Sequence, residues 1–469
     1  MTIWTPDLTR HGGPRYRAIA SALQDDVVQG RLQAGTRLPT HRDLAYRLGV
    51  TVGTVTRAYA EAERRGLIGG EVGRGTFVRD PRRGGPAEPA VPSAMPERDP
   101  ASPLLDLSIN APSVWQDLPP LRAAMQAVAL RGDLGSLLNY QPTLGLPRLR
   151  AAGASWIRQT CGLQVAPENV VLSMGGQGAM HFALAALTRP GDVVLAEQLT
   201  YAGIKALCGH LGLRVVPVAM DQHGLLPDAV EQACRQHGAR ALYTMPTLHN
   251  PTTATLSEER RRELVAVARR NNLFLLEDDV YGYLIEDRLP TLASMAPDIT
   301  CFITSASKSL APGFRVGFLA VPRDLIDRVA TVIRGTMHDS AHIGAAVVAE
   351  LVESGAGLEV AQARRLDIRA RQRHARSVLG IDPAGSHPAA PHIWLQLPDP
   401  WRREDFAREL LNRGIKVTPA DVFAAGRVEM PHAVRVCIGA IDRQNVLDQA
   451  LRTIADLLQS APCQSALTP

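Results

Sequence analysis

Residues 305–317 read SASKSLAPGFRVG and place one lysine, Lys308, directly after an apolar run at residues 301–304. The chain has 51 Lys and Arg residues among its 469, but only three are lysines: Lys205, Lys308 and Lys416. Arginine stays protonated in proteins, whereas lysine can lose its proton and act as a nucleophile. Lys308 therefore indicates chemistry that arginine cannot supply, while Lys205 and Lys416 are predicted to be surface residues.

The same stretch carries groups that suit an anion. Ser305 and Ser307 flank the lysine, and Arg315 follows it by seven residues. Hydroxyl groups and a guanidinium are common partners of phosphate, because arginine donates hydrogen bonds from a planar fork. The segment thus predicts a reactive lysine beside a phosphate-binding site.

Short apolar runs alternate with amphipathic helices from about residue 104 onward, and residues 257–270 have clear helical periodicity. This alternation predicts an α/β domain with a mostly parallel sheet and functional residues at the strand ends. The expected strands are residues 170–173, 193–196, 214–218, 241–245, 273–277, 301–304 and 316–320.

Two further motifs follow expected strands. SMGGQGA at residues 173–179 opens a helix, where glycines let backbone N–H groups approach an anion. HNPT at residues 249–252 holds an Asn before a Pro, which can aim its amide into a site. Each motif also fits a plain turn, since glycine, asparagine and proline are ordinary turn residues. Neither one separates a ligand site from a turn when taken singly.

The run LFLLEDDVY at residues 273–281 ends a buried strand in three acids, Glu277, Asp278 and Asp279. Like charges this close together are unfavourable unless a cation meets them. A protonated pyridine nitrogen is one candidate, because pyridoxal-phosphate (PLP) enzymes keep an acidic partner there. A solvated acidic turn is the alternative interpretation.

Together these motifs resemble fold-type I PLP-dependent aminotransferases over roughly residues 104–460. The pattern S-x-S-K-x-x-x-P-G-x-R-x-G, which follows Asn-Pro and Asp-x-x-Tyr in that order, carries the resemblance. It implies a PLP cofactor bound to Lys308 as a Schiff base, and a small α+β domain beside the large one. Two departures are visible: Thr253 stands where glycine is usual, and Gly176 precedes Gln177 where Ser or Thr is common.

The resemblance also implies roles around the PLP ring. Asp278 pairs with the pyridine nitrogen, Asn250 and Tyr281 bond the ring 3-hydroxyl, and Tyr201 stacks on the ring. The phosphate ligands it implies are Gly176, Gln177, Ser305, Ser307 and Arg315.

Two more residues match the family at positions outside this set. Arg435, in the run VRV, matches the arginine that binds a substrate α-carboxylate. Tyr140 matches a tyrosine that reaches the phosphate bound by the other subunit, which implies a homodimer.

The N-terminal part of the chain differs in charge from the rest. Residues 1–83 hold 14 arginines against 8 acidic residues, a net charge of +6. The whole chain carries +5, so the remainder carries −1. This asymmetry predicts a polyanion partner for the N-terminal segment alone.

The pattern of this segment predicts three helices and a β-hairpin. An apolar stripe begins at Tyr16, Thr40 and Thr51 are helix caps, and a glycine-rich turn at 73–75 joins two short strands. Such an order describes a winged helix-turn-helix, whose third helix enters the DNA major groove. A three-helix protein-binding module is the alternative. The residues predicted to contact DNA are Arg42, Thr51, Thr54, Arg57, Gly73 and Arg74.

Residues 15–79 resemble the DNA-binding domain of the GntR family of bacterial regulators. The signature G-x-L-x-x-G-x-R-L-P-[ST]-x-R-x-L-A, at residues 30–45, carries this resemblance. It implies DNA contacts from Arg42, Thr51, Thr54 and the wing. Val52 and Gly53 depart from the polar residues that many relatives carry, so this helix does not reveal the operator sequence.

Residues 81–103 are rich in Pro, Ala and Gly and predict a linker between domains at 1–80 and 104–460. This order resembles the MocR subfamily of GntR regulators. It implies a PLP-dependent transcription regulator that binds double-stranded DNA, senses PLP or an amino-compound effector, and forms a homodimer with a head-to-tail domain arrangement. A working aminotransferase that carries a DNA-binding domain, and a sensor of PLP alone, are the alternatives.

Other classes are disfavoured by the sequence. No apolar run approaches the roughly 20 residues of a membrane helix, and residues 1–17 contain no signal core. The expected location is therefore the cytoplasm. The six cysteines have neither C-x-x-C nor zinc-type spacing, so neither a metal site nor a disulfide framework is expected.

Overall fold

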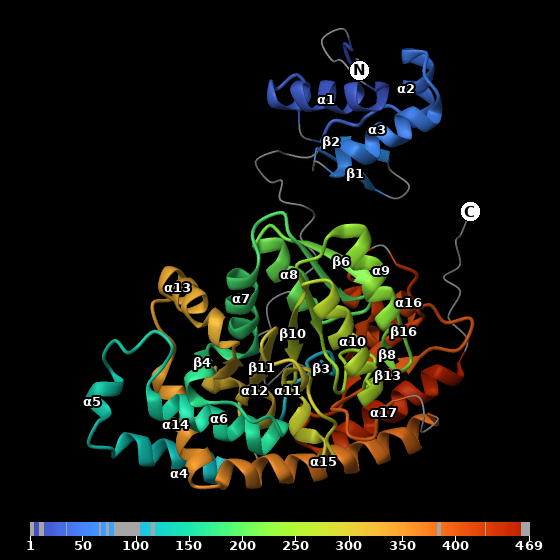
Figure 1. Cartoon of the computed structure of the whole chain (residues 1–469). Coiled ribbons are helices and arrows are strands. Elements are labelled where there is room, and N and C mark those ends of the chain that lie inside the picture. The colour runs from blue at the N-terminus through green and yellow to red at the C-terminus, as the bar shows by residue number, and fades with distance from the viewer. Residues whose placement is uncertain are drawn as a thin grey trace. The chain divides into compact units, whose positions relative to one another are not determined.

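The chain folds into two compact units, Met1–Pro89 and Ala90–Pro469 (Figure 1). The computed structural model describes residues 4–8, 14–33, 35–64, 67–71, 75–78, 104–113, 118–381, 386–426 and 428–460. The predicted linker at 81–103 lies outside these residues. No helix among the described residues is long and apolar enough to cross a membrane.

The N-terminal unit has three helices and a hairpin (Figure 1). Helices α1 (Arg15–Val28) and α2 (His41–Leu48) both pack on α3 (Val52–Arg64). Strands β1 (Ile68–Glu71) and β2 (Gly75–Val78) pair antiparallel. The predicted winged helix-turn-helix is confirmed.

Local sequence fixes the ends of these helices. The Thr40 side chain caps α2 by accepting from Asp43 N at 3.2 Å, and Gly49 ends the helix with φ 60°. Thr51 caps α3 through Thr54 N at 3.2 Å. The apolar stripe predicted for the first helix is buried with the rest of a small core, which includes Ile19, Leu23, Val27, Leu44, Val55 and Tyr59.

The C-terminal unit is built on a seven-stranded sheet in the order β4-β12-β11-β10-β9-β5-β6. Neighbouring strands are parallel except at β12, which runs antiparallel to both β11 and β4. The strands are β4 (Val170–Ser173), β5 (Val193–Glu197), β6 (Arg214–Val218), β9 (Ala241–Thr244), β10 (Phe274–Asp278), β11 (Thr300–Ser305) and β12 (Gly317–Ala320). Each end lies within one residue of the strand predicted from the sequence, because apolar runs of this length are buried on both faces.

Alternation along the strands divides the core between two faces of the sheet. Val194 and Leu276 belong to one cluster with α6 (Pro147–Cys161) and α7 (Gly175–Leu187). Val193, Leu195, Leu242 and Leu275 belong to another with α9 (Pro227–His237) and α10 (Glu258–Arg270). Helices therefore cover both faces of the sheet, and the observed α10 matches the helix expected at 257–270.

A smaller α+β domain has its own core. Its strands form a sheet in the order β13-β16-β15, and β3 pairs with β14 in parallel beside it. The elements are β3 (Leu105–Asp106), β13 (His392–Gln396), β14 (Ile415–Lys416), β15 (Thr418–Pro419), β16 (Ala433–Cys437), α15 (Ala356–Leu379), α16 (Arg403–Asn412) and α17 (Gln444–Gln459). The first strand described in the C-terminal unit, β3, thus belongs to the domain formed by the end of the chain.

The remaining elements connect these layers. The helices are α4 (Leu118–Ala129), α5 (Leu134–Leu137), α8 (Ala202–His210), α11 (Leu292–Met295), α12 (Ala306–Ser309), α13 (Ile326–Thr336) and α14 (His342–Glu353). A short hairpin joins β7 (Met220–Asp221) to β8 (Gly224–Leu225).

Candidate functional site

Lys308 lies on the single turn α12, directly after β11. Ser305 shapes this turn, because its Oγ accepts from Ser307 N at 3.1 Å and donates to Val316 O at 3.0 Å. Lys308 Nζ donates to the backbone oxygen of Asn110. Burial lowers the pKa of Lys308 to about 8, so its amine loses a proton more readily than an exposed lysine does.

Asp278 and Glu277, two of the three acids at the end of β10, have different partners. Asp278 Oδ2 accepts from Tyr243 Oη at 2.8 Å, and burial raises the pKa of Asp278 to about 6 while Lys308 lowers it. Glu277, one residue earlier, is ion-paired with Arg261 at 3.9 Å. Because strand side chains alternate between faces, only the middle acid faces Lys308.

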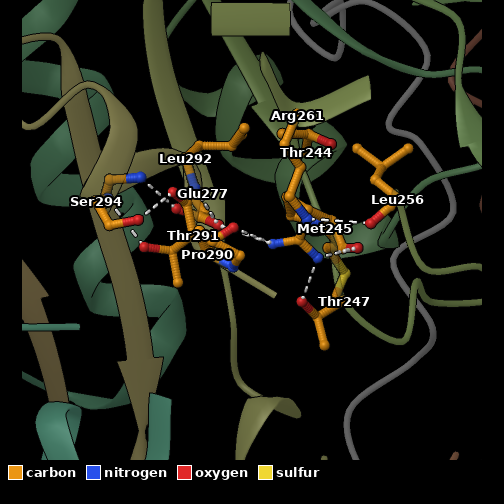
Figure 2. A network of polar contacts seen from close by, with 12 residues as sticks. Thr244, Met245, Thr247, Leu256, Arg261, Glu277, Pro290, Thr291, Leu292 and Ser294 are labelled. Carbon is orange, nitrogen blue, oxygen red and sulfur yellow. Dashed lines mark hydrogen bonds and ion pairs between the residues drawn. The ribbon is translucent and has the colours of Figure 1, made fainter. Parts of the chain in front are cut away.

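Glu277 and Arg261 form a separate buried network (Figure 2). Glu277 accepts from Leu292 N at 3.0 Å and from Ala293 N at 2.8 Å. Arg261 is 1% exposed and donates to oxygens of Leu256, Pro290, Pro246 and Thr247 at 2.9–3.2 Å. These contacts fasten the start of α11 and the loops at residues 246–247, 256 and 290, so the pair holds the fold together.

Arg435 on β16 reaches from the small domain toward the large one. Its Nη1 donates to Asn250 Oδ1 at 2.8 Å, and its Nη2 donates to Ser108 O at 2.5 Å. The guanidinium lies 4.9 Å from the centre of the Phe423 ring. Arg435 is only 7% exposed, yet its Nε has no hydrogen-bond partner among the described residues.

Two tyrosines complete the cluster. Tyr281 is 3% exposed, and burial raises its pKa well above the usual value, so it stays a neutral phenol. Tyr201 precedes α8 and donates to Gln177 Oε1 at 3.2 Å. Gln177 in turn donates to Gly203 O at 3.2 Å.

The predicted anion-binding residues come together from two strand ends. Arg315 Nη2 donates to Met174 O at 3.1 Å, and a Cβ on Gly175 would lie 3.1 Å from that same nitrogen. A Cβ on Gly176 would lie 3.9 Å from Ser305 Cβ. Ser307 Oγ is buried without a hydrogen-bond partner in the described part of the chain.

Tyr140 is 79% exposed, and its ring packs edge-on against His338 with 5.0 Å between centroids. No hydrogen bond among the described residues joins it to the Lys308 cluster.

The structure adds three residues that sequence analysis missed. Tyr243 bonds Asp278, and Asn110 Nδ2 lies 2.8 Å from Tyr281 Oη and 2.9 Å from His392 Nδ1. Asn110 and His392 are 282 positions apart, and neither stands in a motif. The only local signal is a polar residue inside an apolar strand, as His392 is in the run HIWLQ.

The prediction that Lys205 is a surface residue is wrong. It is partly buried on α8, where Nζ donates to Val422 O at 2.7 Å and Ala424 O at 2.8 Å. Burial lowers the pKa of Lys205. Lys205 ties α8 to the small domain. Its apolar methylene chain can pack along apolar side chains while its terminal amine donates hydrogen bonds.

In the N-terminal unit, Arg42 and Arg57 are exposed, as DNA contacts require. Thr51 and Thr54 lie at the start of α3 with 2.9 Å between their hydroxyl oxygens, so both also stabilise the helix end. Val52 beside them is 44% exposed. The predicted wing contacts, Gly73 and Arg74, lie outside the described residues.

Fold and cluster together define a helix-turn-helix regulator joined to an aminotransferase-type domain. The family model "Aminotransferase class I and II" matches residues 102–454, and "Bacterial regulatory proteins, gntR family" matches residues 15–78. The chain belongs to the GntR-type transcription regulators that carry an aminotransferase class I and II domain, and the predicted MocR arrangement is confirmed.

Relatives support this over the full length. The uncharacterized HTH-type transcriptional regulator YdeF of Bacillus subtilis is 30% identical over 457 residues, covering 97% of this chain and 96% of that protein. The pyridoxine biosynthesis transcriptional regulator PdxR of Corynebacterium glutamicum is 30% identical over 75% of each chain. The solved α-aminoadipate aminotransferase LysN of Thermus thermophilus, complexed with N-(5'-phosphopyridoxyl)-L-leucine, has TM-score 0.67 and 25% identity, covering 78% of this chain and 95% of that one.

Proposed function

We propose that this regulator binds PLP at Lys308 and changes its affinity for operator DNA when PLP or an amino compound engages that site. The observation that carries the proposal is the cluster of the partly buried Lys308 with the buried Asp278 and Arg435, in the same chain as a GntR-type helix-turn-helix. A buried amine with a lowered pKa is suited to react with an aldehyde.

The unpaired polar atoms of the cluster fit the groups of PLP and of a bound amino compound. Ser307 Oγ and Arg435 Nε are buried without partners among the described residues, although buried polar groups are normally hydrogen-bonded. Ser307 would meet the phosphate and Arg435 a carboxylate. The buried Asp278 carboxylate would meet the pyridine nitrogen. The donor set therefore fits an anionic, pyridine-type ligand.

When bound, PLP supplies an aldehyde that accepts primary amines and a ring that withdraws electrons. The chain's own residues would position PLP and discriminate among the amines that reach it. Asn250 and Tyr281 would hold the ring oxygen, and Tyr201 would stack on the ring. The phosphate would be held by Gly176, Gln177, Ser305, Ser307 and Arg315.

The DNA partner would be contacted by the start of α3 and by Arg42, and we place the protein's action in the cytoplasm. Arg57→Ala should weaken binding and reduce the slope of log affinity against log salt by about 1, if Arg57 meets a phosphate. A sequence-dependent loss with an unchanged slope would instead indicate a base contact.

A homodimer is part of the proposal. Large apolar side chains are exposed on and after α4: Met125 at 54%, Leu130 at 85%, Leu138 at 71% and Tyr140 at 79%. Such a patch fits burial against a second copy. Placed there, Tyr140 would reach the other subunit's site in a head-to-tail arrangement.

The names of two relatives support the ligand class. PdxR is a regulator of pyridoxine biosynthesis, and LysN holds a phosphopyridoxyl amino acid. The intact cluster also favours a second candidate, transamination by the same domain. Multiple turnovers with an amino acid and a keto acid would support that candidate, whereas binding without turnover would support a sensor.

The deciding experiment measures operator binding by the full chain, using DNA selected from a random pool. Binding is compared without PLP, with PLP, and with PLP plus a panel of primary amines. We expect one of these additions to change the affinity at least about fivefold. Equal affinity in all conditions would refute ligand control. Lys308→Ala is the matched variant and should bind DNA without responding.

A further inference from the structure

The first described segment of the C-terminal unit, residues 104–113, runs from the predicted linker into the Lys308 site. Leu107 fastens it to the small domain, since its N–H donates to Lys416 O and its carbonyl accepts from Cys437 N, both at 2.8 Å. Ser113 N donates to Gly439 O at 3.0 Å. The segment is thus hydrogen-bonded to strands β14 and β16 and to the residues that follow β16.

Within this segment, the orientation of the Asn110 side-chain amide is fixed by its hydrogen bond to His392. His392 Nε2 lies 3.0 Å from Pro251 O, and a carbonyl only accepts, so Nε2 carries the proton. Burial lowers the pKa of His392 well below its usual value, so the ring is neutral and Nδ1 is an acceptor. Asn110 must therefore point its amide NH₂ at Nδ1.

The same NH₂ group has a second hydrogen, which it donates to Tyr281 Oη at 2.8 Å. Because the Tyr281 oxygen accepts this bond, its own hydrogen points elsewhere. That hydrogen is available to the ring oxygen of a bound ligand. His392 and Asn110 together therefore orient the Tyr281 donor from the small-domain side.

The backbone of Asn110 contacts the reactive amine itself, because its carbonyl accepts from Lys308 Nζ. Covalent use of the Lys308 nitrogen removes hydrogens from it and withdraws this donor from Asn110. One residue of the segment thus touches both Lys308 and Tyr281, and it is the segment that leads toward the DNA-binding unit.

We propose that Asn110, oriented by His392, is a positioning residue that fixes the Tyr281 donor and transmits the state of Lys308 to residues 104–113. The inference rests on the proposed function for its PLP ligand. It assigns a role to two residues that no family motif marks. Its consequence is that occupancy of Lys308 alters the segment adjoining the linker.

The first test uses Asn110→Asp in the full PLP-loaded chain. The introduced carboxylate only accepts, so Tyr281 should turn its hydrogen toward that carboxylate and away from the ligand. Other charged groups that act on Lys308 are Asp278, Arg435 and Arg315, and they are unchanged. Both the redirected Tyr281 hydrogen and the added negative charge should raise the pH midpoint of the PLP absorbance, together by about one unit or more, and the uncharged His392 variants below separate the two effects. An unshifted midpoint would overturn the positioning role.

A second pair of variants tests His392 independently. His392→Phe keeps a ring but removes both nitrogens, and should shift the same midpoint. His392→Asn offers an oxygen near the Nδ1 position and should restore part of the wild-type value. His374→Gln is the control, because His374 pairs with Asp448 at 2.8 Å away from the site. Equal midpoints in all three would contradict the inference.

The third test measures transmission by hydrogen exchange. Adding PLP should change the exchange of amides in residues 104–113 in the wild type, and much less in Asn110→Asp. The DNA response to ligand should shrink to below about twofold in that variant. If wild-type DNA binding ignores ligand while the absorbance midpoint still shifts, the proposed regulation fails and the role of Asn110 stands. If wild type and variant respond alike, the inference fails.

Discussion

Strand β10 ends between two buried polar clusters that differ in how fully they are hydrogen-bonded. Glu277 and Arg261 bond backbone groups on every side (Figure 2). Asp278, the next residue, belongs to the Lys308 cluster. There, Ser307 Oγ and Arg435 Nε have no partners among the described residues.

This difference distinguishes buried polar residues that stabilise the fold from buried polar residues that are available to a ligand. An unpaired buried polar group costs stability, so one that lies beside a candidate site is consistent with a ligand that would meet it there. The Glu277 network closes on its own chain, whereas the Lys308 cluster is left open to a ligand. Adjacent residues of one strand can serve both purposes, because strand side chains alternate between faces.

The largest expected effect is a loss of stability when the hydrogen-bonded Glu277–Arg261 cluster is broken. Arg261→Ala should lower the free energy of unfolding by about 3–5 kcal/mol, because Glu277 would lose its buried ionic partner and four oxygens would lose their donor. Urea unfolding measures this loss. Arg262→Ala is the control, since Arg262 is exposed and its one ion pair within the described ranges is with Glu258; this variant should cost less than about 0.5 kcal/mol. Similar losses in both variants would erase the distinction between the clusters.

Neutralising Asp278 and Glu277 one at a time should show that the first serves ligand binding and the second serves stability. Asp278→Asn should lower PLP affinity by about 10- to 100-fold, as expected for a lost charged hydrogen bond, with little change in unfolding. Glu277→Gln should instead cost about 1–3 kcal/mol of stability, because an amide donor would face Leu292 N or Ala293 N. Spectroscopic titration with PLP measures the affinity, and urea unfolding measures the stability. A stability loss in Asp278→Asn together with an affinity loss in Glu277→Gln would reverse our assignment.

The open cluster should also show a distinct pH dependence. Burial lowers the pKa of Lys308 to about 8, so its neutral, reactive fraction falls about tenfold per pH unit below that value. The initial rate at which PLP is trapped on Lys308 by borohydride should rise with pH and level off above about 8. A rise that continues to pH 10 would show an ordinary lysine.

The smallest effect should come from the unpaired hydroxyl. Ser307→Ala should reduce PLP affinity about fivefold, near 1 kcal/mol, while leaving the stability of the PLP-free protein unchanged or slightly higher. Ser309→Ala is a close control, since Ser309 Oγ already bonds Ser305 O at 3.4 Å. Isothermal titration with PLP distinguishes them, and a larger loss in Ser309→Ala would contradict the phosphate role of Ser307.

Much of the fold was readable from local pattern. The expected strands at 170–173 and 214–218 coincide with β4 and β6, and Thr40 and Gly49 bound α2 as their chemistry requires. Side-chain periodicity and capping act over a few residues, so sequence alone expresses them. Lys308 was also identifiable, because its scarcity and its flanking serines are local facts.

Only the tertiary structure decided how distant residues meet. The sequence showed three acids in a row, but the pleat and its neighbours assigned Asp278 to Lys308 and Glu277 to Arg261. Likewise, Lys205 is hydrogen-bonded to the small domain, and Asn110 contacts His392, which lies 282 positions later in the sequence. Contacts of this kind depend on which strands pair and how domains pack, and no short-range pattern records them.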